Sequence, residues 1–302
     1  MISVRNVSKL YDNTPAIEEI TLSIDRGSIL GLVGYNGAGK TTLLKTICGI
    51  FQADKGDVLV DGESIYDNPR VKANVFLVAD EPYIIPQASM KRMSNFYRGY
   101  YHKWSDDLFG KLATLMDLDI AMRMSSFSKG MLRQASIIFA LSSQPDFLLL
   151  DESFDGIDPA MRDIIKQLLL QMISEKGTGI IISSHNLREL ENLCDHICII
   201  NGRKIAVNTS MTKIQMYHNK VVVAFNEEYD QGFFNSIAID YSDWKANGKL
   251  LQFIAHGDPD EIRQKLMKLC PTLIEFVPLT LEEIFLSEME ARKYDISNIF
   301  DS

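Results

Sequence analysis

The chain has 302 residues, of which 46% are hydrophobic, and it carries a formal net charge of -9. This length accommodates one sizeable core and a smaller second unit. The acidic balance argues against a nucleic-acid-binding protein, which usually displays a basic surface. No apolar run approaches the roughly 18 residues of a spanning helix. The cysteines show no paired framework, so we expect a reducing, cytosolic setting. They are Cys48, Cys194, Cys198 and Cys270.

The first part of the chain predicts strands around one glycine-rich loop. Apolar and polar residues alternate through residues 21–25, which is typical of a half-buried strand. Residues 29–33 form a short apolar strand that leads into the glycine-rich stretch. Apolar residues then recur at helical spacing through residues 41–50. Residues 58–60 and 75–79 are expected to be further strands.

The middle of the chain changes character. Residues 89–141 predict helices without a clear strand, and the aromatic-rich helix at residues 94–104 fits either a core or an interface. Continuous apolar strands return at residues 147–150 and 180–183, with a helix at residues 159–174 between them. Such strands separated by helices indicate a largely parallel sheet that is covered on both faces.

A separate tail follows, whose pattern predicts a small α+β unit. Strands are expected at residues 221–225, 237–241, 250–255 and 273–277, and helices at residues 260–269 and 281–292. We therefore expect two domains, residues 1–207 and 208–302.

The glycine-rich stretch at residues 34–41, G-Y-N-G-A-G-K-T, fits the phosphate-loop pattern G-x-x-x-x-G-K-[ST] between a strand and a helix. Phosphate oxygens must be met by several backbone N–H groups, so the loop has to curl tightly, and glycine permits that backbone. The positive end of the following helix points at the phosphates. Lys40 is expected to reach the β- and γ-phosphates and Thr41 to bind Mg²⁺. The expected nucleotide-binding residues of this segment are Gly34, Asn36, Gly37, Ala38, Gly39, Lys40, Thr41 and Thr42.

A second motif is an apolar strand that ends in two acids, Asp151 and Glu152. The carboxyl ends of buried parallel strands are where open α/β sheets bind ligands. Asp151 is expected to hold Mg²⁺, and Glu152 to polarise the attacking water. Alone, this pattern favours a strand that simply ends in solvated acids. The phosphate loop upstream decides for the functional interpretation.

Together these motifs resemble those of the ABC ATPase family over roughly residues 1–205. The family signature, usually L-S-G-G-Q, is matched by F-S-K-G-M at residues 127–131. The resemblance implies that Ser128, Lys129 and Gly130 meet a γ-phosphate at the start of a helix, and Ser128 also suits a helix N-cap.

The resemblance also implies a fold. It is the α/β fold of P-loop NTPases, with a mostly parallel sheet core and an N-terminal antiparallel β part. A helical subdomain is inserted at about residues 86–143, and the small α+β tail is a regulatory or dimerisation domain.

Three further residues match family positions. Tyr11 matches the aromatic that stacks on adenine, and a core or turn tyrosine is the alternative. Asp158 matches the aspartate of the D-loop, and Pro159 is well placed to open the next helix. His185 follows a predicted strand and matches the switch histidine, which contacts the γ-phosphate and holds the catalytic water.

One position departs from the family. The glutamine that senses the γ-phosphate and Mg²⁺ is replaced by Asp80. Some transporter ATPases carry an acid at this position. We therefore keep Asp80 among the expected metal-binding residues, with Thr41 and Asp151.

The resemblance implies that ATP and Mg²⁺ bind between two ATPase subunits packed head to tail, as a homodimer or a heterodimer. The S-K-G-M signature, the F-D-G-I-D-P D-loop and the T-L-E-E-I-F segment at residues 280–285 are similar to those of bacterial exporters with separate membrane subunits. We therefore expect an ATP-hydrolysing subunit that drives transport from the cytoplasmic face of the membrane. It would be held there by integral membrane permease subunits, without a nucleic-acid partner. The alternative is a soluble ABC ATPase that acts on the ribosome or on nucleic acid.

Overall fold

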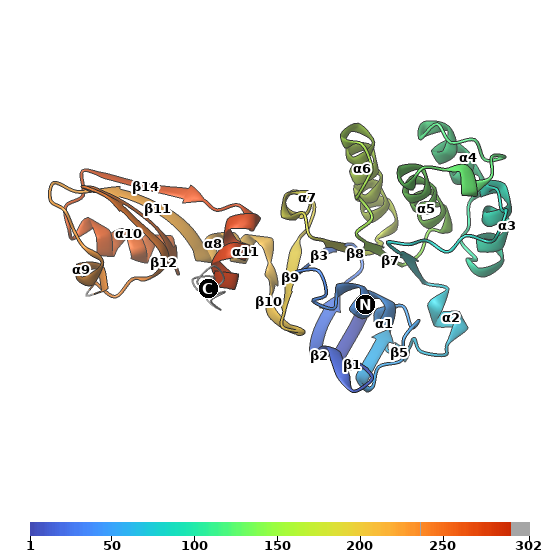
Figure 1. Ribbon diagram of the computed structural model, residues 1–302, viewed down its shortest axis with the longest axis horizontal. Coiled ribbons are helices and arrows are strands. Elements are labelled where there is room, and N and C mark those ends of the chain that lie inside the picture. The colour runs from blue at the N-terminus through green and yellow to red at the C-terminus, as the bar shows by residue number, and fades with distance from the viewer. Residues whose placement is uncertain (236, 291–302) are drawn as a thin grey trace, which may run out of the picture. The chain divides into compact units, whose positions relative to one another are not determined.

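The computed structural model describes residues 1–235 and 237–290 (Figure 1). The chain forms two compact units, Met1–Asn208 and a second one that begins at Thr209. Each unit has its own hydrophobic core. Among the described residues, no helix combines the length and the apolar character needed to cross a membrane.

The first unit is built on a six-stranded sheet in the order β10-β9-β3-β8-β7-β6. Its strands are β3 (Ile29–Val33), β6 (Val75–Val78), β7 (Phe147–Asp151), β8 (Gly179–Ser184), β9 (His196–Asn201) and β10 (Lys204–Ser210). From β6 to β9 each neighbouring pair is parallel. Strands β3, β7 and β8 are buried along their whole length, which explains their unbroken apolar sequences. The mostly parallel core is confirmed.

A second sheet of the first unit is antiparallel, in the order β2-β1-β4-β5. Its strands are β1 (Ile2–Tyr11), β2 (Thr14–Ile24), β4 (Lys55–Val60) and β5 (Glu63–Ser64). Helix α1 (Lys40–Ile47) lies between the two sheets (Figure 1), and its Leu43, Leu44 and Ile47 join a core that includes residues of both. On the other side of the parallel sheet lie α6 (Pro159–Lys176) and α7 (Leu187–Glu191). The first unit is therefore layered: the antiparallel sheet and α1 lie on one side of the parallel sheet, and α6 and α7 lie on the other.

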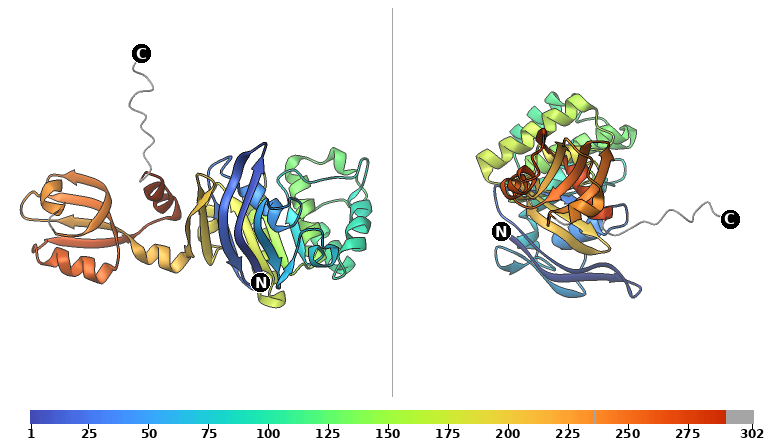
Figure 2. Two further views of the ribbon diagram at one scale, coloured as in Figure 1. Left: turned by 90° about the horizontal axis from the view of Figure 1, so that it is seen from below. Right: turned by 90° about the vertical axis from the view of Figure 1, so that its left-hand side faces the viewer.

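Helices fill the segment between β6 and β7. Figure 2 shows them gathered at one edge of the first unit. They are α3 (Met90–Tyr100), α4 (Asp106–Leu115), the 3-10 turn η1 (Met124–Ser126) and α5 (Lys129–Ser143); the short α2 (Pro69–Lys72) precedes β6. Helix α3, which holds most of the predicted aromatic-rich helix, has one packed face and one exposed face. Tyr97 packs against Phe76, and its burial raises its pKa to about 12. Phe96 and Tyr100 are exposed. The core interpretation holds for one face, and the interface interpretation stays a prediction for the other.

The second unit is a four-stranded antiparallel sheet in the order β12-β13-β11-β14. Its elements are α8 (Met211–Tyr217), β11 (His218–Ala224), α9 (Gln231–Asn235), β12 (Asp240–Asn247), β13 (Leu250–His256), α10 (Pro259–Met267), β14 (Leu273–Pro278) and α11 (Leu281–Glu290). Alternate residues of β11 and β13, such as Val221 and Phe253, form its core together with Ile262 and Leu266 of α10.

In the tail, one predicted strand is displaced and one predicted helix extends past the described residues. The strand expected at residues 237–241 is wrong in position, because β12 begins at Asp240 and runs to Asn247. In the described part of the chain this edge strand pairs with β13 alone and is mostly exposed, so it needs few apolar residues and its pattern is weak. The helix expected at residues 281–292 is α11, and residues 291 and 292 lie outside the described part of the chain, as does the rest of the predicted second domain to residue 302.

Candidate active site

The loop between β3 and α1 curls as the phosphate-loop pattern predicts. Gly37 and Gly39 have positive φ angles of 79° and 105°. A Cβ atom at Gly39 would lie 2.5 Å from Cγ2 of Ile17 and 2.6 Å from the carbonyl oxygen of Ala16, so a larger residue would displace the loop. Gly39 directly precedes α1, whose first N–H groups have no partner within the helix. The loop therefore presents a helix start suited to anions.

Lys40 opens α1 with a side chain that is only 6% exposed. Its Nζ atom donates to the carbonyl oxygen of Gly34 at 2.8 Å. The same ammonium group forms an ion pair with Oε1 of Glu152 at 3.3 Å. The fold thus joins the phosphate loop directly to the predicted catalytic acid.

Glu152 follows β7 in an unusual conformation. Its φ of 47° lies in the left-handed region, which costs a residue other than glycine about 1–3 kcal/mol. Its N–H group donates to the carbonyl oxygen and to Oγ of Ser183, at 3.2 and 3.1 Å. Its carbonyl oxygen accepts from Nη1 of Arg133 at 2.9 Å. These contacts maintain the strained backbone.

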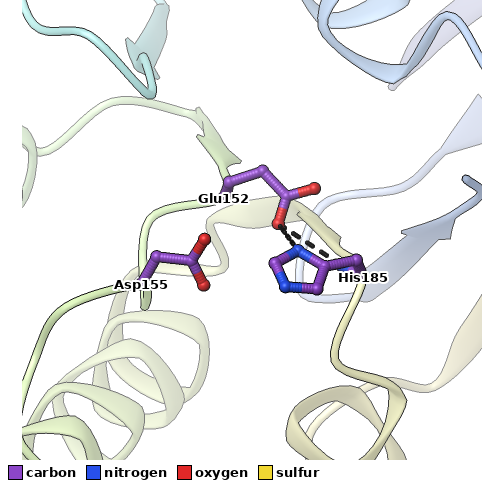
Figure 3. A group of neighbouring side chains, drawn as sticks. All are labelled: Glu152, Asp155 and His185. Carbon is purple, nitrogen blue, oxygen red and sulfur yellow. Dashed lines mark hydrogen bonds and ion pairs between the residues drawn. The ribbon is translucent and has the colours of Figure 1, made fainter. Parts of the chain in front are cut away.

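The Glu152 carboxylate also faces His185, which follows β8. Its Oε2 atom lies 2.8 Å from Nδ1 of His185 and accepts from the His185 backbone N–H at 3.3 Å (Figure 3). Asp155 lies beside this pair, and the ligand atoms of the three residues are within 4.8 Å of one another. A carboxylate oriented by an imidazole can accept a proton from a bound water once its ammonium partner has been displaced.

The three residues predicted to bind a metal, Thr41, Asp80 and Asp151, line one cavity of about 510 Å³. Asp151 is 1% exposed, and its Oδ1 accepts from Oγ of Ser183 at 2.6 Å. Asp80 is ion-paired with Arg133. Hydroxyl and carboxylate oxygens are the ligands that Mg²⁺ prefers, so the donor set of this cavity fits that ion.

The signature segment lies at the surface. Ser128 caps α5, accepting from the N–H of Met131 at 3.2 Å, and both Ser128 and Lys129 are exposed. Gly130 touches the segment before α6, because a Cβ atom there would lie 2.7 Å from the carbonyl oxygen of Gly156. Asp158 caps α6, accepting from the N–H of Met161 at 3.0 Å. The predicted cap by Ser128 and the predicted place of Pro159 at the start of α6 are thus observed, and the phosphate contacts stay predictions.

The remaining predicted nucleotide residues are spread around the loop. Gly34 is buried, whereas Asn36 is exposed and Ala38 and Thr42 are half-buried. Tyr11 ends β1, is 44% exposed and meets the ring of Phe51 edge-on at 6.0 Å. An exposed aromatic at this place remains available for stacking, so its adenine role stays a prediction.

Sequence reasoning missed two residues that touch Glu152, the predicted catalytic acid. Ser183 joins Asp151 and Glu152, and its only sequence signal is a hydroxyl at the end of a buried strand beside the acidic pair. Arg133 joins Asp80 and Glu152. Its signal is indirect: an acid replaces the family glutamine at position 80 and needs a charge partner.

Comparison with known proteins identifies the family. Residues 17–155 match the family described as "ABC transporter". The chain is 31% identical over 215 residues to the Nod factor export ATP-binding protein I of Cupriavidus metallidurans, an alignment that covers 68% of this chain and 70% of that protein. The chain belongs to the ABC transporter ATP-binding family. As a member it is an ATP-binding and ATP-hydrolysing enzyme, and the predicted identification is confirmed.

The ABC family likeness extends beyond the first unit. The ABC transporter ATP-binding protein YtrB of Bacillus subtilis is 27% identical over 295 residues, covering 97% of this chain and 99% of that protein. A solved ATP-binding subunit of an ABC transporter superposes with a TM-score of 0.67 at 24% identity, covering 71% of this chain and 92% of that one. A dimeric, post-hydrolysis structure of the cassette MJ0796 bound to ADP and Pi reaches 0.63 at 18% identity, covering 70% and 99%. These structures confirm the predicted fold.

Proposed function

We propose that this chain is the motor subunit of an ABC exporter, which closes as a dimer around ATP and drives separate membrane subunits from the cytoplasmic side. The observation that carries the motor role is the Glu152 carboxylate held between Lys40 and His185. Export is supported by the relatives named Nod factor export ATP-binding protein I, at 31% identity. The membrane partner is supported by the transporter names of the relatives.

The geometry suggests how the chain's own residues act. Lys40 exchanges the Gly34 carbonyl and the Glu152 carboxylate for phosphate oxygens. Glu152 then accepts the proton of the attacking water, and His185 keeps its carboxylate oriented. Exposed Ser128 and Lys129 meet the phosphates held by a second subunit, as the start of α5 suits an anion. ATP thereby favours the closed dimer through contacts that hydrolysis removes.

Thr41 and Asp151 would hold Mg²⁺, with Asp80 on the wall of the same cavity. When bound, this ion neutralises developing charge on the phosphates. Tyr11 stacks on the adenine.

Turnover and association of the Glu152→Gln variant test the motor role. We expect turnover to fall by at least about a hundredfold, since general-base assistance is worth that much. Light scattering should then show a dimer in ATP that the wild type forms only transiently. The exposed acid of α6 in Glu175→Gln is a matched control. Near-normal turnover of the Glu152 variant would remove this residue from the role.

Flotation with membranes tests the partner. We expect the tagged chain to bind vesicles prepared from its own host's membranes and not protein-free liposomes of the same lipids. Equal binding to both would indicate a lipid contact, and binding to neither would contradict the proposed membrane partner.

A further inference from the structure

Arg133 connects two parts of the site that the motifs treat separately. It lies on α5, about one turn after the signature residue Ser128. Nη1 of its guanidinium donates to the carbonyl oxygen of Glu152 at 2.9 Å, and Nη2 is ion-paired with Oδ1 of Asp80. The Arg133 side chain is only 14% exposed, whereas that of Asp80 is 54% exposed, so the bridge is buried at its Arg133 end and reaches solvent at Asp80.

The contact with Glu152 falls where the backbone needs support. Glu152 has a φ of 47°, and the direction of its carboxylate depends on that strained backbone. Its N–H group is held by Ser183. Its carbonyl oxygen is held by Arg133 at 2.9 Å and, more weakly, by the N–H of Asp155 at 3.3 Å. Arg133 therefore supplies the charged donor on one side of the catalytic residue.

The contact with Asp80 fixes the arginine. Guanidinium is planar and presents donors in a fixed fork, so one side chain can bind a carbonyl and a carboxylate at once. A neutral residue at position 80 would leave the second arm of the fork without an anion. Asp80 follows β6, and Glu152 follows the neighbouring strand β7. The bridge thus spans the carboxyl ends of two adjacent strands.

We propose that Arg133 is a positioning residue for the catalytic Glu152, and that Asp80 is its anchor. A displacement of the loop after β6 then reaches the catalytic acid through one guanidinium group. This inference rests on the proposed role of Glu152 in hydrolysis. It assigns Asp80 to Arg133 instead of to the metal.

Steady-state kinetics of Arg133→Gln test the proposal. We expect kcat to fall by about tenfold, the usual effect of losing a charged hydrogen bond, and KM for ATP to change by much less, because the hydrogen bonds of Arg133 in the described structure go to Glu152 and Asp80 and not to the phosphate loop. Arg133→Lys keeps the charge without the fork, so its kcat should lie between those of the wild type and the glutamine variant. Arg70→Gln, which breaks the exposed ion pair of Arg70 with Glu63, is the matched control and should keep normal kinetics.

A double-variant cycle tests the anchor. If Asp80 acts through Arg133, the Asp80→Asn/Arg133→Gln variant should be no slower than Arg133→Gln alone. If the kcat losses of the two single variants multiply in the double variant, the two residues act independently and Asp80 is not the anchor of Arg133. An Asp80→Asn variant that needs more Mg²⁺ for activity would likewise assign Asp80 to the metal and overturn its anchoring role.

A crystal structure of Arg133→Gln gives a readout independent of turnover. We expect Glu152 to leave its positive φ or its carboxylate to turn away from His185. An unchanged Glu152 together with normal kcat would overturn the proposal while leaving the motor role intact. Failure of the wild type to hydrolyse ATP would count against the motor role. In that case the structure alone tests the positioning role, and an unaltered Glu152 backbone in Arg133→Gln would reject it.

Discussion

At the scale of single residues, the Glu152 carboxylate and a nucleotide compete for the ammonium group of Lys40. Their ion pair at 3.3 Å lies between side chains that are 6% and 14% exposed, so it is weakened little by solvent. A nucleotide must take Lys40 away from Glu152 before the carboxylate can accept a proton. The affinity for nucleotide therefore contains the free energy of breaking this pair.

Nucleotide affinity of Glu152→Gln checks this competition. Removing the carboxylate charge should tighten ADP binding by about fivefold, which corresponds to about 1 kcal/mol for such a pair. ADP is the suitable probe because it separates the effect from the trapping of an ATP-bound dimer. Titration calorimetry measures it, with Glu175→Gln as control. Weaker ADP binding in the variant would show that Glu152 helps to hold the nucleotide.

At two helical glycines, substitution by alanine should change the stability of the chain in opposite directions. A Cβ atom at Gly130 would lie 2.7 Å from a backbone oxygen of Gly156, so Gly130→Ala should destabilise the chain by about 1–3 kcal/mol. Gly110 of α4 has nothing within 4 Å, so Gly110→Ala should stabilise it by about 0.5–1 kcal/mol. Urea unfolding measures both, and a stabilised Gly130 variant would contradict the close approach.

At the scale of elements, α11 begins with a reciprocal cap. The N–H of Thr280 donates to Oε2 of Glu283 at 3.0 Å, and the N–H of Glu283 donates to Oγ1 of Thr280 at 3.2 Å. Glu283 also pairs with Lys220 of β11 at 2.9 Å. The backbone hydrogen bond from Thr280, and then Lys220, lower the pKa of Glu283. One carboxylate thus ties the helix start to the sheet of the second unit.

Unfolding of Glu283→Gln at two pH values tests this cap. A lowered pKa means that the folded state prefers the ionised carboxylate, so its contribution is complete above the ordinary glutamate pKa of about 4.3 and is lost as the pH falls through the lower folded-state pKa. The variant should therefore be less stable than the wild type at pH 7, and the difference should shrink toward pH 3. Thr280→Ala should cost about 1 kcal/mol at pH 7. An equal difference at both pH values would exclude the carboxylate.

At the scale of the whole molecule, the two units have separate cores, and the burial of the cysteines differs between them. Cys48, Cys194 and Cys198 are buried in the first unit, whereas Cys270 of the second unit is exposed. Burial raises the pKa of Cys48 to about 11 and that of Cys198 to about 12. Buried thiols with such values react only after the surrounding structure opens.

Alkylation by iodoacetamide should follow this division. We expect one thiol, Cys270, to react quickly in the native chain, and the other three to react only in denaturant. Excess ATP should raise the denaturant concentration at which those three react, since a ligand at 100 times its Kd stabilises the binding unit by about 2.7 kcal/mol. Mass spectrometry of peptides assigns each site. Rapid native labelling of Cys198 would contradict the buried sheet.

Short-range sequence patterns were sufficient to predict much of the structure of this protein. The phosphate loop, the acidic end of β7 and the alternation of strands and helices depend on a few neighbouring residues, because positive φ angles, helix starts and buried strands impose local requirements. For the same reason the cap by Ser128 and the place of Pro159 at the start of α6 could be anticipated from sequence. The edge strand β12 was misplaced because an exposed edge imposes little pattern.

Only the tertiary structure joined residues that are distant in the chain. Glu152 meets Lys40 of α1, Arg133 of α5, Ser183 of β8 and His185 directly after β8, so its partners come from three different elements. The order of strands in the parallel sheet brings their carboxyl ends together, and no local pattern encodes that order. The partner of Asp80 was likewise beyond the sequence, because its ion pair with Arg133 spans 53 positions of the chain and depends on where α5 packs. Residue types and local backbone are properties of neighbours in sequence, whereas charge pairing and orientation are properties of neighbours in space.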